Sequence, residues 1–144
     1  MSAKVLILTA LGFLTSCTNK ENCEDILLSV EHLACENSKY SINIDLSNNY
    51  AYIRSEEEYD LLVTGTCHPE IDFSNYDLII GKQASGNEND TIYYDLRRTC
   101  PENRLTLNIE IVQSDLTRHD NVTYHAVIPK LGDEETIFVN IYAH

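Results

Sequence analysis

Positive charge is scarce in this chain. Its 144 residues include 10 Lys and Arg against 23 Asp and Glu, so the formal net charge is −13 at pH 7. Such a chain repels phosphate, which argues against a nucleic-acid partner. Gly and Pro are also few, at five and three, and this excludes collagen-like and proline-rich classes. Trp is absent whereas Tyr occurs nine times, a bias that suits sheet faces where one edge of each ring meets water.

Long apolar runs are also missing, apart from one near the start. Residues 5–14 read VLILTALGFL after Lys4. Ten helical residues cover about 15 Å, half of a hydrocarbon core of roughly 30 Å, so this run indicates a signal peptide over 1–16 rather than a transmembrane helix. With 43% hydrophobic residues, the rest of the chain is long enough to bury one core, and we expect a single globular domain over 23–144.

The end of the apolar run carries a processing signal. The residues Leu14-Thr15-Ser16-Cys17 resemble the lipobox of bacterial lipoproteins, in which small residues precede an acylated cysteine. The resemblance implies lipidation of Cys17 and a membrane anchor, because two or three acyl chains hold a protein stably at a bilayer. The polar residues 17–22 then form a tether. Since Thr18 replaces the Asp that retains many lipoproteins at the inner membrane, the outer membrane is favoured, with the domain periplasmic or surface-exposed.

Removal of Cys17 from the cysteine set leaves an even number for disulfides: Cys23, Cys35, Cys67 and Cys100. If the strands after residue 76 run out and back, Cys67 and Cys100 lie at the same end of the sheet, which favours their pairing. Cys23 would then pair with Cys35. A full helix over 24–34 would hold those two Cα atoms about 18 Å apart, beyond a limit of roughly 7 Å. That helix is therefore short, or else Cys23 and Cys35 pair with the other two cysteines.

Periodicity predicts an α+β domain, mostly antiparallel β meander or sandwich, with one short helix over about 55–64. Apolar spacing over 24–34 favours a second short helix, although ILLSV is also compatible with a strand. Ser55 and Glu58 form a capping-box pattern, and Gly65 is expected to end the helix. Alternation predicts a hairpin of 40–46 with 50–54. It also predicts later strands over 76–82, 91–98, 104–112, 121–130 and 136–144, joined as a meander.

The order of helix, strands and the motifs IDFS (71–74) and IPK (128–130) resembles small lipoproteins of the Bacteroidetes group. It is also similar to the C-terminal domain of a protein that stabilises a protease complex. The resemblance covers about 51–131. It implies a fold and a cellular location, and it assigns no catalytic residues to this chain.

Catalytic and metal motifs are not apparent in the sequence. There is no Gly-x-Ser-x-Gly and no phosphate-binding glycine loop. His119 and His125 are not spaced as zinc ligands, and Cys67 beside His68 suits a disulfide better than a metal. We therefore expect no metal, no cofactor and no enzyme activity.

The expected function is a non-catalytic binding or accessory module of the cell envelope, whose partners are the membrane and an envelope protein or glycan. A protease-stabilising or protease-inhibiting domain is the alternative, and an enzyme without a recognisable motif is the second. Tyr93 and Tyr94 are the candidate binding residues, and because they are adjacent in a strand only one of them can face the core.

Overall fold

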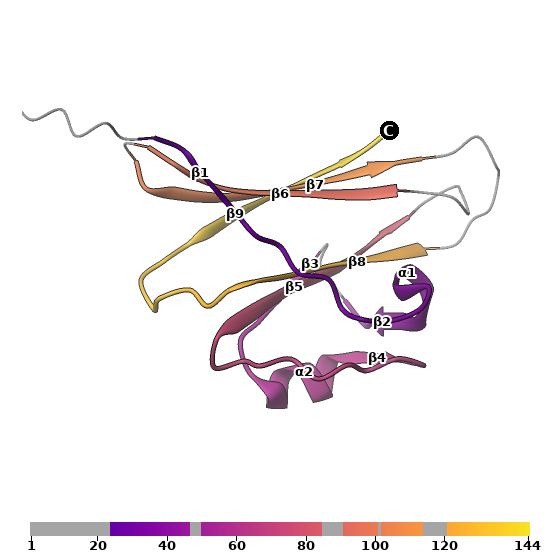
Figure 1. Cartoon of the computed structure of the whole chain (residues 1–144). Helices are drawn as coiled ribbons and strands as arrows, with labels where there is room; N and C mark the ends of the chain where they lie inside the picture. Colours follow the sequence, from indigo (N-terminus) through magenta and orange to yellow (C-terminus); the bar gives the residue numbers. More distant parts are fainter. Residues whose placement is uncertain (1–23, 47–49, 85–90, 101, 114–120) are drawn as a thin grey trace, which may run out of the picture.

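The computed structural model describes residues 24–46, 50–84, 91–100, 102–113 and 121–144. These residues form two facing sheets with a third layer beneath them (Figure 1). The first sheet has the order β1 (Ile26–Leu28), β6 (Thr91–Thr99), β7 (Arg104–Val112) and β9 (Ile137–Ala143). The second has the order β3 (Tyr50–Ile53), β5 (Tyr76–Ala84) and β8 (Asn121–Pro129). The third layer holds α1 (Ser38–Ser41), α2 (Glu56–Leu62) and the pair β2 (Ile42–Ile44) and β4 (Val63–Gly65).

Two apolar cores separate these layers. The core between the two sheets contains alternate residues of β7, all at most 2% exposed: Leu105, Leu107, Ile109 and Ile111. The other core lies between the second sheet and the third layer, and it includes Ile44, Tyr59 and Ile80. Strands β5 and β8 are therefore covered on both faces, which explains their nearly continuous apolar runs.

Local interactions determine where the helix α2 begins and ends. The Ser55 hydroxyl accepts from the Glu58 backbone N–H at 3.2 Å, and the Glu58 carboxylate accepts from the Arg54 N–H at 3.1 Å. The helix ends at Leu62, before the residue expected, because Val63 turns extended and enters β4. Gly65 instead permits a close approach: its φ is +120°, and a Cβ there would lie 2.2 Å from the Ser41 carbonyl oxygen.

The predicted fold class is confirmed, but several strand pairings are wrong. The sheets form a sandwich instead of a meander: β6 pairs with β7, whereas β5 pairs with β3 and β8, and β9 joins β7 in parallel. The predicted hairpin of 40–46 with 50–54 is also wrong, because β2 pairs with β4 and β3 with β5. Both wrong pairings have the same physical cause. Strand β5 is apolar on both faces, so each face has to be covered by another layer.

The segment 24–34 is a strand and bridge, so the predicted helix is wrong. Ile26–Leu28 pairs with β6 of the first sheet, and Glu31 then forms an antiparallel bridge with Val127 of the second sheet. The segment therefore crosses from one sheet edge to the other, and its backbone groups are satisfied by both edges.

The disulfide expectation is corrected in the same region. Cys35 bonds to Cys67, with Cα atoms 6.1 Å apart, so neither the Cys67–Cys100 pair nor the Cys23–Cys35 pair forms. The pairing of β2 with β4 explains this, because the Ser41 carbonyl accepts from the N–H groups of Thr66 and Cys67 and brings the two chain segments together. Cys100 is disulfide-bonded as well. Cys23 lies outside the described residues.

Candidate functional site

The structure separates the two candidate tyrosines. Tyr94 turns inward and packs against the core between the sheets, where its hydroxyl accepts from the His125 backbone N–H at 3.0 Å. Tyr93 points the other way and is 56% exposed on the outer face of the first sheet. Of the pair, Tyr93 is therefore the one whose ring stands exposed on the outer face.

The outer face of the first sheet carries a pocket of about 430 Å³ around Tyr93. Register places Tyr93 opposite Glu110 of β7, and Glu110 opposite Tyr142 of β9. Tyr142 is 53% exposed, so both rings stand in solvent with a carboxylate between them. Sequence analysis missed Tyr142, because only the parallel pairing of β9 with β7 places it beside Tyr93.

The next row of the pocket is polar. Asp95 lies opposite Asn108, which lies opposite Asn140. The Asn140 side-chain N–H donates to the Asn108 side-chain oxygen at 2.9 Å, and the Arg97 guanidinium donates to both oxygens of Asp95 at 2.8 Å. The Asp95 carboxylate raises the pKa of Arg97 by hydrogen bonding and by charge. Asp95 and Asn108 are thus each held in place by one neighbouring side chain.

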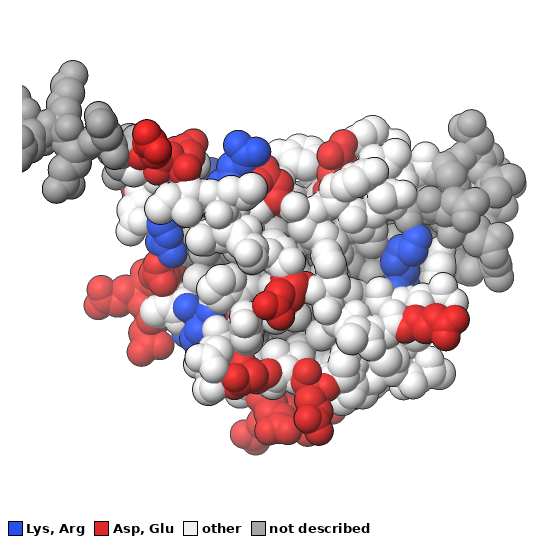
Figure 2. All heavy atoms as spheres, viewed as in Figure 1, with Lys and Arg blue, Asp and Glu red and all other residues white. Residues whose placement is uncertain are grey.

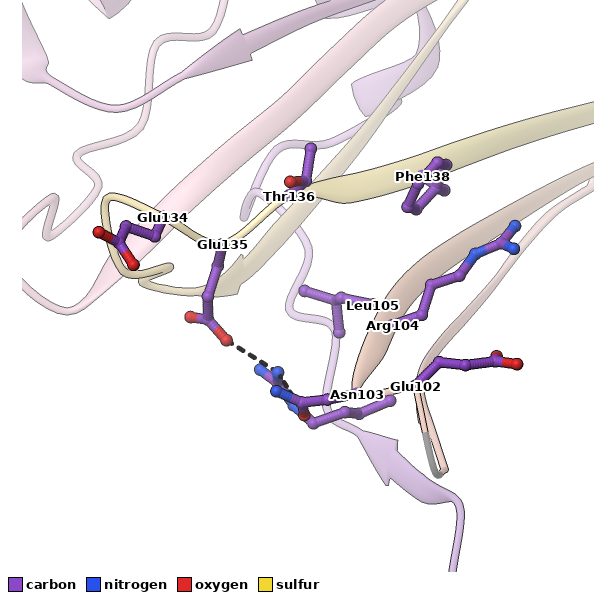
Figure 3. Close-up of a pocket in the computed structure, with 9 residues that line it drawn as sticks. Glu102, Asn103, Arg104, Leu105, Glu134, Glu135, Thr136 and Phe138 are labelled. Atoms are coloured by element: carbon purple, nitrogen blue, oxygen red, sulfur yellow. Dashed lines mark hydrogen bonds and ion pairs between the residues drawn. The ribbon is translucent and has the colours of Figure 1, made fainter.

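A second hollow lies at the other end of the same sheet, beside the β6–β7 turn (Figure 3). It measures about 350 Å³. Arg98 and Glu135 pair across it at 2.8 Å, and the Arg104 guanidinium stacks 4.3 Å from the centre of the Phe138 ring. Phe138 is 48% exposed, so the exposed aromatic residues of the outer face extend along β9 from Tyr142 to this hollow.

The sequence predicts no metal site, and the described side chains that it weighs as ligands have other partners. Cys67 is oxidised, and His68 pairs with Asp60 at 3.0 Å on the surface. His119 lies outside the described residues. Within the described parts of the chain, no group of three or more His, Cys, Asp or Glu side chains could hold a metal ion.

His125 is a histidine whose burial the sequence did not reveal. It is 3% exposed, and its Nδ1 accepts from the Leu33 backbone N–H at 3.5 Å. Its ring centre lies 6.2 Å from that of His32, and both rings line a hollow of about 340 Å³ with Tyr94 and Lys39. Burial, and then the nearby His32, lowers the pKa of His125 from 6.5 to about 4.

Asp77 is the centre of a buried ionic network that the sequence also did not reveal. Its side chain is fully buried, and Lys130 pairs with it at 2.8 Å. The Tyr52 hydroxyl donates to it at 2.6 Å and the Leu131 N–H at 3.0 Å. Burial alone raises the pKa of Asp77, but these hydrogen bonds and Lys130 outweigh burial and hold it below its usual range. The network ties β5 to the end of β8, so its evident role is structural.

The signal peptide over 1–16, the tether over 17–22 and the lipidation site Cys17 lie outside the described residues. None of the helices in the described residues is both long enough and apolar enough to cross a bilayer. Comparison with protein-family models, curated proteins and solved structures finds no match to this chain.

Proposed function

We propose that this chain is a lipid-anchored, non-catalytic binding module of the bacterial cell envelope, placed at the outer membrane. The apolar run and the lipobox-like residues that end at Cys17 support the anchor. A tether of six residues then joins the anchor to the folded domain. The class of partner that suits this location is another component of the envelope, either a protein or a glycan.

The observation that carries the binding role is the outer face of the first sheet. Three aromatic rings on one face are about half exposed: Tyr93, Phe138 and Tyr142. Exposed large apolar side chains that occur singly need no explanation, but several on one face mark an interaction site. Tyrosine suits such a site because it offers wide contact at a low cost in side-chain entropy.

Site-specific photo-crosslinking in the bacterial host tests this proposal. A photoreactive phenylalanine analogue replaces Tyr93 in one strain and Leu61 in another, since Leu61 is 77% exposed on α2, far from this face. We expect an adduct specific to the Tyr93 position, identified by mass spectrometry. A protease as that adduct would favour the protease-accessory role. Identical adducts at both positions, or none at position 93, would contradict the proposal.

A further inference from the structure

The pocket around Tyr93 has a regular geometry. Tyr93, Glu110 and Tyr142 occupy one row across three adjacent strands. Neighbouring strands lie about 4.8 Å apart, so the two tyrosines stand about 10 Å apart with the Glu110 carboxylate midway between them. A group bound above Glu110 would therefore lie within reach of both rings.

The charges that line this pocket are of one sign. It is lined by Tyr93, Tyr94, Asp95, Asn108, Glu110, Tyr142 and His144, with no Lys or Arg among them. Asp95 is paired with Arg97 from outside the lining, whereas Glu110 lies 3.2 Å from the His144 ring nitrogen, which is cationic only when protonated. The Glu110 side chain is 49% exposed. A negative group between two aromatic rings is thus open to solvent.

The net charge of the whole chain favours cationic partners in general. Acidic side chains outnumber basic ones on the face seen in Figure 2, but they gather most densely over α2, which is remote from the pocket. With a net charge of −13, the chain attracts cations and repels anions over distances of about one Debye length, roughly 8 Å in physiological salt.

We infer that this pocket binds the alkylammonium or guanidinium group of a Lys or Arg side chain presented by a partner protein. The inference rests on the proposed function and names the chemistry of its site. A cation over Glu110 gains a charge-assisted hydrogen bond and lies close to two electron-rich ring faces. We assign this cation to a partner protein because the exposed surface continues along β9 to Phe138. That surface is much larger than one small cation covers.

The test is a binding titration of the mature lipoprotein in neutral detergent. The probe is a capped Gly-Arg-Gly-Arg-Gly peptide, and its control contains citrulline, which keeps the shape of arginine without the charge. We expect the arginine peptide to bind about tenfold more tightly than the citrulline peptide. Free methylguanidinium should bind more weakly than the arginine peptide, because it lacks the surrounding contacts.

Variants assign the binding to this pocket. Glu110→Gln should weaken binding of the arginine peptide about fivefold. Glu56→Gln removes the same charge from the remote α2 and should change binding less than about twofold. Tyr142→Ala removes one ring and should weaken binding of the arginine peptide, and Tyr142→Phe, which keeps the ring, should weaken it less. Thermal melts check that each variant is folded.

Three results would overturn the inference. The citrulline peptide could bind equally well, Glu110→Gln could behave like Glu56→Gln, or methylguanidinium could match the peptide. If a neutral oligosaccharide such as maltohexaose binds at Tyr93 and Tyr142 while the arginine peptide does not, the cation inference fails and the binding module stands. If the crosslinks at Tyr93 are also absent, the proposed function fails with it.

Discussion

His125 is expected to make the stability of this domain sensitive to mild acid. The ring is buried on β8, and its Nδ1 accepts from the Leu33 N–H, which requires a nitrogen without a proton. The other titratable groups that face this region are His32, Lys39 and Tyr94. Protonation of His125 would bury a cation and remove the hydrogen bond to Leu33, in the segment before Cys35.

The direction and size of this pH effect on stability follow from the pKa of His125 in the unfolded chain and in the folded chain. The unfolded chain binds a proton at His125 near pH 6.5, whereas the folded chain binds it only near pH 4. The folded state therefore loses stability as the pH falls from 6.5 to 4, and keeps it above 6.5. At about 1.36 kcal/mol per pH unit, the loss between pH 6.5 and 5 is about 2 kcal/mol.

Urea unfolding at pH 7.5 and pH 5 measures this effect. The wild type should lose about 2 kcal/mol more than His125→Gln between the two pH values. Equal losses in the wild type and in His125→Gln would refute the reasoning.

Further predictions concern the ionic network, the disulfide and the anchor. Asp77→Asn removes the charge that pairs with Lys130 and should lower the free energy of unfolding by about 2 kcal/mol, measured in urea at pH 7; an unchanged value would contradict the network's role. Peptide mapping of the unreduced protein should recover Cys35 linked to Cys67, and loss of that bond should cost about 4 kcal/mol for a loop of this length. Cys17→Ala should leave an unprocessed or soluble precursor, and equal membrane recovery of mutant and wild type after carbonate washing would refute acylation.

Local patterns predicted the parts of the fold that local chemistry determines. Strict alternation over 104–112 predicted a strand, and the strand is observed there with Leu105 and Ile109 buried and Glu110 exposed. The capping pattern at Ser55 placed the start of α2 because the hydrogen bond spans only three residues. Such patterns depend only on residues that are close together in the sequence.

Pairing between distant strands could not be predicted in the same way. The run Leu78-Ile79-Ile80 is buried on both faces, so it carries no alternation that names a partner. The Cys35–Cys67 bond depends on the β2–β4 pair, and assuming a meander placed Cys67 beside Cys100 instead.

The candidate site was only half predictable for a related reason. Adjacency in one strand showed that Tyr93 and Tyr94 face opposite ways. Tyr142 lies in the same row as Tyr93 because β9 pairs in parallel with β7, and no turn motif in the sequence predicts that pairing. Likewise Asp77 and Leu131 are 54 residues apart, and His125 and Leu33 are 92 apart.

The central claim is that the outer face of the first sheet binds a partner. Its most direct test is the affinity of the partner identified by crosslinking for three proteins: the wild type, the double variant Tyr93→Ala with Tyr142→Ala, and Leu61→Ala. We expect the double variant to bind at least about thirtyfold more weakly with a nearly unchanged melting temperature, and Leu61→Ala to bind as the wild type does. Equal affinity of all three proteins would contradict it.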